Sequence, residues 1–179
     1  MEPIKIIEKY YTVGTELYQL LIRHSRSVAD KALSIASAHP EMDLDITFIE
    51  EAAMLHDIGI ILCEAPEIGC YGAFEYVCHG YLGADLLRKE GYPRHALVSE
   101  RHTGTGISMR MIEEKNLPLP HKDFIPVSPE EQLICFADKF FSKTKPDKEK
   151  EIVQIKASLQ KHGEDTVLRF NHWCNLFFH

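Results

Sequence analysis

The stretch FIEEAAMLHDIGIIL, residues 48–62, sets a histidine and an aspartate side by side in an otherwise apolar run. Alanine, leucine, methionine and isoleucine at this density predict a buried helix. Burying an ionised carboxylate without a partner costs several kcal/mol, even after the surroundings relax. His56 and Asp57 therefore need a partner inside the protein.

Composition narrows the class of protein. The chain has 179 residues, of which 45% are hydrophobic and 26% charged, as is typical of one soluble globular domain. A net charge of -7 disfavours nucleic-acid polymers and anionic membranes as main partners. No apolar run approaches the about 20 residues of a membrane span, and the N-terminus lacks a secretion signal. We therefore expect a cytoplasmic protein.

The cysteines indicate a reducing environment. There are five of them, an odd number, and no C-x-x-C pair occurs. Neither a disulfide framework nor a zinc ribbon fits this pattern. We expect reduced, mostly buried thiols.

Helical periodicity runs through the whole chain and predicts an all-α, single-domain fold. Residues 15–38 repeat apolar positions at the spacing of one helical face, and this helix should stop before Pro40. Thr47 and Glu50 fit a capping box for the helix that carries His56 and Asp57. Further helices are expected over residues 75–90, 94–102, 108–116, 130–144, 152–163 and 164–179.

The clearest helix start is the segment Ser128-Pro129-Glu130-Glu131. It combines an N-cap serine, a proline at the first helical position and a capping-box glutamate. The preceding segment, residues 117–127, holds three prolines and should be irregular. We find no internal repeat and no alternating strand pattern.

Histidines and carboxylates on five separate segments point with the apolar faces. His24 follows Leu20 by four residues and precedes Val28 by four, so it faces inward. His56 and Asp57 are about 100° apart around a helix, so both can reach one point beside it. The inward residues are His24, His56, Asp57, His79, His102 and Asp138.

A single inward histidine is more often a satisfied core residue than a metal ligand. Taken together, however, these residues lack a matching pattern of inward arginine or lysine, whereas one divalent ion would satisfy several of them at once. Imidazole and carboxylate ligands suit Mn, Fe, Ni, Co or Zn. The sequence therefore predicts one or two bound transition-metal ions.

His24, His56-Asp57 and Asp138 resemble, in this order, the H…HD…D signature of the HD-domain superfamily of metal-dependent phosphohydrolases. HDIG at residues 56–59 resembles the subgroup named after those letters. The resemblance covers about residues 15–145. It implies a helical bundle with a central metal site, on which C-terminal helices of residues 150–179 would pack.

Finer resemblances narrow the branch of the superfamily. HGYLGADLLRKEGYP at 79–93, ERHTGTGIS at 100–108 and residues 117–139 resemble small stand-alone HD proteins described as predicted hydrolases. The pieces H-x-x-x-G-A and R-H-T-G are similar to HD enzymes that cleave dinucleoside polyphosphates. The resemblance implies hydrolysis of a phosphate ester or anhydride of a small molecule, with a nucleotide the best candidate.

The resemblance also suggests roles for individual residues. His24, His56, Asp57 and Asp138 would hold the metal, and Asp57 is in addition a candidate to orient or deprotonate the water that attacks phosphorus. His79 and His102 would complete a second metal site. The alternatives are that these two histidines contact substrate or simply pack.

One departure from several HD subgroups concerns phosphate binding. These subgroups carry a lysine directly after HDIG, where this chain has Ile60. The candidates for phosphate contact are therefore elsewhere. They are Arg26, Arg101, Thr103, Lys139 and Lys143, each of which could equally be a solvated surface group.

Alternative functions and structural roles stay open at this point. The same ligands could serve a di-iron HD-type oxygenase, or a non-catalytic, metal-stabilised ligand-binding module. The glycine- and aromatic-containing segment 64–76 is either a lid over the site or an ordinary connection. The terminal helix could dock on the core or on a second copy of the chain, forming a homodimer.

Overall fold

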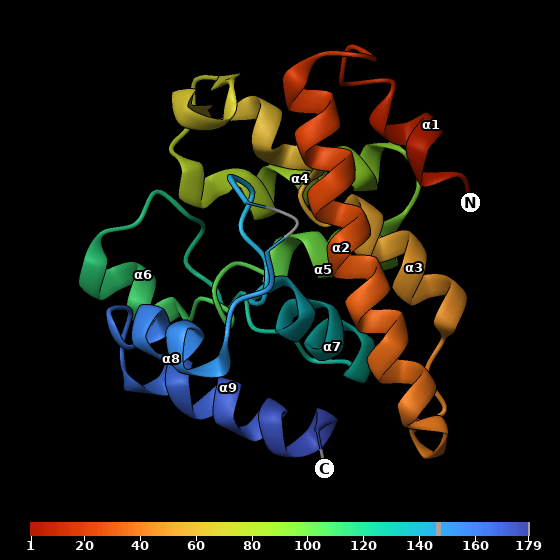
Figure 1. Cartoon of the computed structure of the whole chain (residues 1–179). Helices are drawn as coiled ribbons and strands as arrows, with labels where there is room; N and C mark the ends of the chain where they lie inside the picture. The colour runs from red at the N-terminus through yellow and green to blue at the C-terminus, as the bar shows by residue number, and fades with distance from the viewer. Residues whose placement is uncertain (146–147, 179) are drawn as a thin grey trace.

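The computed structural model describes residues 1–145 and 148–178. These residues form nine α-helices, four short 3-10 helices and one two-stranded hairpin (Figure 1). The prediction of an all-α helical bundle is confirmed. His179, expected in the terminal helix, lies outside the described residues.

Helix α2 (Glu16–Ala38) runs the height of the molecule in Figure 1. The Thr15 hydroxyl accepts a hydrogen bond from Tyr18 N and caps its start, and the helix ends at His39, before Pro40, as predicted. Its inner face buries Leu21, His24 and Val28. The short helices α1 (Pro3–Ile7) and η1 (Pro40–Met42), which the periodicity did not predict, flank it.

Helix α3 (Ile46–Leu55) begins and ends earlier than predicted. The side chain of Asp45, not of Thr47, caps it by accepting from Phe48 N at 3.0 Å. His56 is the C-cap residue, and Asp57 precedes the 3-10 helix η2 (Ile58–Leu62). The expected capping box was wrong, because Asp45 caps the helix two residues earlier. The placement of His56 and Asp57 inside one helix was also wrong, because the chain changes to 3-10 geometry directly after them.

The segment 64–76 contains the only strands in the described residues. Strand β1 (Glu64–Ala65) pairs antiparallel with β2 (Cys70–Tyr71) around the 3-10 helix η3 (Pro66–Ile68). The 3-10 helix η4 (Tyr76–Cys78) then leads into α4 (His79–Lys89), and Gly91 turns the chain with a φ of +87°. The predicted helix over 75–90 is therefore a 3-10 turn followed by an α-helix.

The middle of the chain follows the predicted order of helices. Helix α5 (Pro93–Arg101) ends at His102, and α6 (Met109–Lys115) is capped by Ser108. Helix α7 (Pro129–Asp138) starts as predicted, since the Ser128 hydroxyl accepts from Glu131 N at 3.2 Å. It ends about six residues earlier than expected, with Lys139 as its C-cap, and so places Asp138 in its last turn.

Helices α8 (Ile152–Gln160) and α9 (Glu164–Phe177) cover one side of the bundle (Figure 1). Phe170, Trp173 and Phe177 of α9 lie in one hydrophobic cluster with buried residues of α2, α3 and α7. Phe136 of α7 lies 5.3 Å, between ring centroids, from both Phe170 and Phe177. The terminal helix therefore docks on the core of its own chain, and homodimer formation stays a prediction.

The five cysteines are free, and four of them are buried. Burial raises the pKa of the Cys63 and Cys135 thiols to about 12, so both stay protonated at neutral pH. This agrees with the expected reduced thiols. Among the described helices, none combines the length and the apolar character that crossing a bilayer requires.

Gly59, the glycine of HDIG, allows two elements to touch. A Cβ atom at this position would lie 2.1 Å from the backbone oxygen of His79 and 2.4 Å from Gly83 N. Helix α4 therefore rests directly on η2, backbone against backbone. This contact brings the first turn of α4, with His79, next to Asp57.

We expect the substitution Gly59→Ala to destabilise the fold by about 1–3 kcal/mol, because the added methyl group overlaps backbone atoms that cannot swing away. Thermal unfolding of the variant beside the wild type provides the measurement. A Gly59→Ala protein that is as stable as the wild type would contradict this close contact.

Candidate metal centre

The structure brings all six predicted ligands together in the interior. Their side-chain ligand atoms form two groups, and within each group all of these atoms lie within 4.8 Å of one another. None of the six residues is more than 8% exposed. The first group is His24, His56, Asp57 and Asp138, and the second is Asp57, His79 and His102.

In the first group two carboxylates face two imidazoles. Asp57 Oδ2 lies 3.2 Å from Nε2 of both His24 and His56. Asp138 Oδ1 lies 3.0 Å from His24 Nε2 and 3.5 Å from His56 Nε2. Four residues from three helical regions that are distant in sequence thus converge on one point.

In the second group the other oxygen of Asp57 is used. Asp57 Oδ1 lies 3.3 Å from His79 Nε2 and 3.2 Å from His102 Nε2. The two histidine nitrogens are 3.1 Å apart. Asp57 therefore presents one carboxylate oxygen to each group, which is the arrangement of a bridging ligand.

Three of the histidines are oriented in the same way. In His56, His79 and His102 the Nδ1 atom lies 2.6, 2.6 and 2.7 Å from the backbone oxygen of the residue three positions earlier. Because a carbonyl oxygen only accepts hydrogen bonds, Nδ1 must donate, and in a neutral ring the lone pair is then on Nε2. This is how metal-binding histidines are commonly oriented.

The second group fits a cation better than a proton. Burial lowers the pKa of His79 to about 3 and also lowers the pKa of His102, so both rings are neutral. Their Nε2 lone pairs then face each other and Asp57 Oδ1, and three acceptors cannot hydrogen-bond to one another. A metal ion would satisfy all three.

The carboxylates of the first group shift the pKa of His56. Burial alone would lower the pKa of His56, but Asp57 and Asp138 outweigh it and raise the pKa to about 9. His56 Nε2 is buried without a hydrogen-bond partner among the described residues. Nitrogen and oxygen donors without a thiolate suit Mn, Fe, Ni, Co or Zn, so these residues could hold a divalent metal.

Two lysines from the segment after α7 contact the carboxylates. Lys143 Nζ lies 2.7 Å from Asp57 Oδ2, and Lys139 Nζ lies 2.8 Å from Asp138 Oδ2. Burial would lower the pKa of each lysine, but the carboxylates outweigh it and raise the pKa, so both are charged. Lys143 thus occupies the same carboxylate oxygen that a metal in the first group would use.

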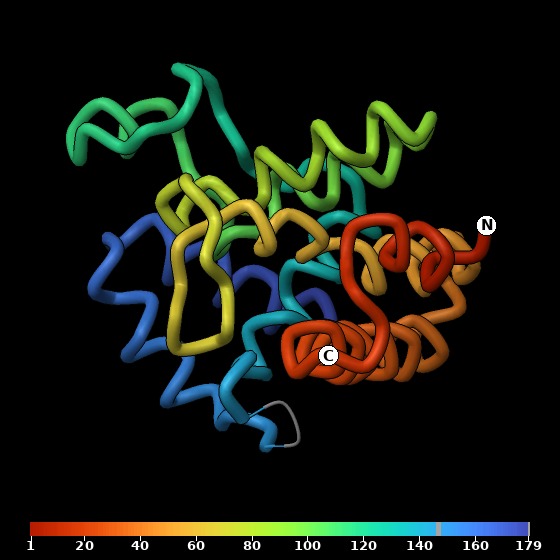
Figure 2. Tube along the Cα trace, turned by 90° about the horizontal axis from the view of Figure 1, so that it is seen from above, coloured from red at the N-terminus to blue at the C-terminus, as the bar shows by residue number. Residues whose placement is uncertain are grey.

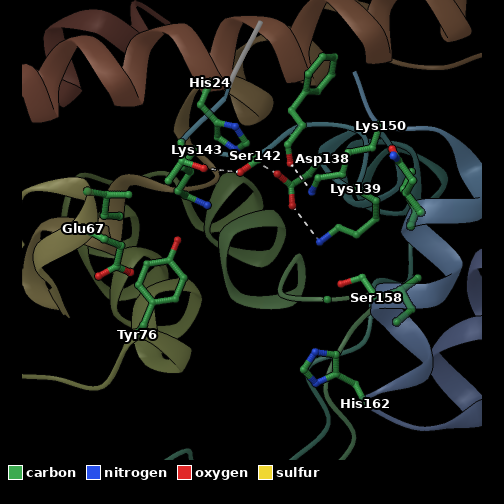
Figure 3. A pocket seen from close by; sticks show the side chains of 17 residues that line it. His24, Glu67, Tyr76, Asp138, Lys139, Ser142, Lys143, Lys150, Ser158 and His162 are labelled. Atoms are coloured by element: carbon green, nitrogen blue, oxygen red, sulfur yellow. Dashed lines mark hydrogen bonds and ion pairs between the residues drawn. The ribbon is translucent and has the colours of Figure 1, made fainter. Parts of the chain in front are cut away.

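A cavity of about 630 Å³ opens beside the first group. Figure 3 shows Lys139 and Lys143 projecting into it next to Asp138 and His24, with His162 at the far end. Lys150 also lines it, and Glu67 and Tyr76 form the facing wall. Figure 2 shows the hairpin segment that carries Glu67 as the yellow loop near the centre. Whether this segment moves as a lid stays a prediction.

The predicted phosphate-binding residues separate into two sets. Lys139 and Lys143 line the cavity, and Thr103 lines a neighbouring apolar cavity. Arg26 instead pairs with Glu50 at 2.9 Å on the outer face, because two residues after His24 the helix has turned by about 200°. Arg101 pairs with Glu131 at 2.8 Å. Neither arginine lines the cavity, and the role of both in substrate binding stays a prediction.

Three residues at the site were missed by the sequence analysis. The ring of Tyr76 stacks on His79 at 4.7 Å between centroids, and the Ser99 hydroxyl donates to the backbone oxygen of His56 at 2.8 Å. Lys150 lies in a charged segment with no periodicity. The spacing of three residues before each histidine could have identified Tyr76 and Ser99, whereas no local signal identifies Lys150.

Comparison with known families agrees with this geometry. The HD domain family matches residues 21–142. The chain therefore belongs to the HD-domain superfamily of metal-dependent phosphohydrolases. No solved structure gives a significant match.

The chain is similar in sequence to proteins of three organisms. The chain is 31% identical over 165 residues to a tRNA (cytidine(56)-2'-O)-methyltransferase of Thermoplasma volcanium, a match that covers 91% of this chain but 43% of that protein. A protein of the same name from Picrophilus torridus is 30% identical over 144 residues, 80% of this chain and 36% of that protein. An uncharacterized protein of Methanocaldococcus jannaschii is 31% identical over 128 residues, 70% of this chain and 68% of that protein.

We expect the protein to bind two divalent ions when saturated with Mn²⁺. The double substitution His79→Ala, His102→Ala should leave one ion, whereas His56→Ala, Asp57→Ala should remove both, because Asp57 belongs to both groups. Elemental analysis of protein purified without chelator, with circular dichroism to verify folding, measures this. Equal metal content in all three folded proteins would rule out these ligands.

We expect Lys143→Met to bind Mn²⁺ at least about tenfold more tightly than the wild type, because like charges within about 4 Å repel by several kcal/mol in a protein interior. Lys145→Met is the control, since it removes the same charge from an exposed position in the same segment. Competition with a chromophoric chelator gives the dissociation constants. Equal or weaker Mn²⁺ binding by Lys143→Met would show that this lysine does not compete with the metal.

Proposed function

We propose that the protein is a metal-dependent phosphohydrolase that cleaves a phosphate ester or anhydride of a small molecule. The observation that supports this most is the concentration of lysine at the metal centre. Lys139, Lys143 and Lys150 all line the cavity beside His24 and Asp138. The chain as a whole has a net charge of -7, so this positive lining is a local feature that suits an anionic ligand.

The two lysines nearest the centre can serve the phosphate directly. Each is paired with a carboxylate that would also ligate a metal, Lys143 with Asp57 and Lys139 with Asp138. Asp57 and Asp138 would hold a divalent ion, and the two ammonium groups would then be free to face the cavity. They can then donate charge-assisted hydrogen bonds to phosphoryl oxygens, which replace the contact of a lysine after HDIG.

The residues of the chain support the reaction chiefly by holding the metal ligands and the phosphate in fixed positions. A bound divalent ion supplies charge stabilisation for the phosphoryl oxygens and lowers the pKa of a water molecule. The three backbone-bonded histidines keep their Nε2 atoms in place, so that little reorganisation is needed. Lys139, Lys143 and Lys150 orient the phosphate beside this centre.

Asp57 is better suited to bridging than to accepting a proton. Burial would raise its pKa, but Lys143 and His56 outweigh it and hold the pKa of the carboxyl well below its usual range. A weak base at neutral pH is a poor proton acceptor. The predicted role of Asp57 in orienting water remains compatible with bridging, and its role as a general base stays a prediction.

The names of the similar proteins do not transfer to this chain. The chain spans 43% and 36% of the length of the two methyltransferases, so more than half of each has no counterpart here. We therefore do not propose methyl transfer. The oxygenase alternative uses the same ligands with iron, and oxygen consumption separates it from phosphate release.

We expect metal-dependent release of phosphate from at least one member of a panel of nucleoside monophosphates, dinucleoside polyphosphates, cyclic dinucleotides and simple phosphoesters, with Mn²⁺, Co²⁺, Ni²⁺ or Mg²⁺ added. Lys150→Met should raise KM about tenfold or more, because it removes a charged contact without touching a metal ligand. Lys161→Met, at an exposed position outside the cavity lining, is the control.

Three results would count against this function. If none of these compounds releases phosphate with any of the metals, the centre is not a phosphohydrolase. If iron copurifies and oxygen is consumed with an organic substrate, the oxygenase interpretation replaces it. A ligand that raises the melting temperature without being turned over would instead indicate a binding module.

A further inference from the structure

A second cavity, of about 260 Å³, lies next to the lysine-lined one and differs from it in chemistry. Gly104, Leu159 and His162 line both cavities, so the two adjoin along these residues. The side chains that set the character of the second cavity are aliphatic. They are Val77, Ile107, Met111, Leu117 and Leu159, and we call this space the apolar compartment.

The apolar compartment is built on the same turns as the second ligand group. Val77 stands two residues before His79, and Thr103 and Gly104 directly follow His102. A Cβ atom at Gly104 would meet no other atom within 4 Å, so the backbone there borders open space. In Figure 3, His162, which the two cavities share, lies at the opposite end of the lysine-lined cavity from His24. The apolar compartment therefore adjoins the lysine-lined cavity at the end opposite His24.

Four polar side chains, Thr103, Lys115, His162 and Thr166, line the apolar compartment, and two of them already have partners. The Thr166 hydroxyl donates to backbone oxygens of its own chain, with Leu159 O at 2.9 Å, and Lys115 Nζ donates to His162 O at 3.3 Å. A nucleobase carries several donors and acceptors on its edge, and each would need a partner once removed from water. A hydrocarbon group carries none.

We propose that the apolar compartment binds the part of the substrate that does not react, and that this part is a hydrocarbon group, aliphatic or aromatic, rather than a nucleobase. The inference rests on the proposed function, because it assumes that the phosphate of the same molecule lies among Lys139, Lys143 and Lys150. The substrate class is then the phosphate esters or anhydrides of apolar alcohols. The apolar compartment would therefore determine which substrate binds, and it would take no part in breaking the phosphate bond.

Calorimetric titration of the Mn²⁺-loaded protein with alkylphosphonates, from methylphosphonate to octylphosphonate, tests the proposal directly. The P–C bond is not hydrolysed, so binding is measured apart from turnover. Each added methylene should strengthen binding by about fourfold until the compartment is full. Affinity that does not rise with chain length, absence of binding, or tighter binding of adenosine 5'-monophosphate than of octylphosphonate would each overturn the proposal.

Two matched variants test whether the dependence of affinity on chain length arises in the apolar compartment. Met111→Trp should fill the apolar compartment and abolish the dependence on chain length. Met109→Trp introduces the same residue two positions earlier on α6, where the side chain is 43% exposed and outside the lining, and should retain the dependence. If both variants retain it, or both lose it, the hydrocarbon is bound elsewhere and the proposal falls.

Parallel assays with the corresponding alkyl phosphates separate this inference from the proposed function. Chain-length-dependent binding without phosphate release from any compound would support the compartment and contradict the phosphohydrolase. Phosphate release with a kcat/KM that is independent of chain length would support the phosphohydrolase and overturn the compartment.

Discussion

The structure depends on one buried carboxylate that faces four imidazole nitrogens. Asp57 is 0% exposed, and its two oxygens lie 3.2–3.3 Å from the Nε2 atoms of four histidines. The Nε2 lone pairs of His79 and His102 and the Asp57 Oδ1 atom repel one another unless a cation lies between them. Lys143 supplies one positive charge to Asp57 Oδ2, and a pair of divalent ions would satisfy the remaining groups.

Helix ends, rather than helix middles, provide most of this site. His56 and His102 are the C-cap residues of α3 and α5, and their Nδ1 atoms donate to Ala53 O and Ser99 O, which are among the last carbonyls of those helices. Such terminal carbonyls have no partner within the helix. One hydrogen bond therefore completes the helix end and aims the ring at the centre. The ends of α3 and α5 also carry partial negative charge, which favours a nearby cation.

The charge of the cavity is opposite to that of the chain. The segment that follows α7 brings Lys139, Lys143 and Lys150 to one cavity, although acidic residues outnumber basic ones, 27 to 20, in the whole sequence. Because α7 ends at Asp138, the next residues leave the helix and can fold back over the carboxylates. The end of α7 at Asp138 therefore sets both the position of this predicted ligand and that of the lysines beside it.

The sequence by itself determined the all-α fold and which histidines face the core, because both depend on local periodicity. A histidine in an apolar helical stripe must face the core, as His24 does, whatever the rest of the chain does. The identity of the cations near the phosphate was decided only by the tertiary structure. Arg26 is close to His24 in sequence but lies on the outer face, whereas Lys143 reaches Asp57 from 86 positions away along the chain. The apolar compartment likewise joins residues from η4, α6 and α8, which no local pattern connects. Contacts of this kind follow from how helices pack, and packing is set by close approaches such as Gly59 on α4.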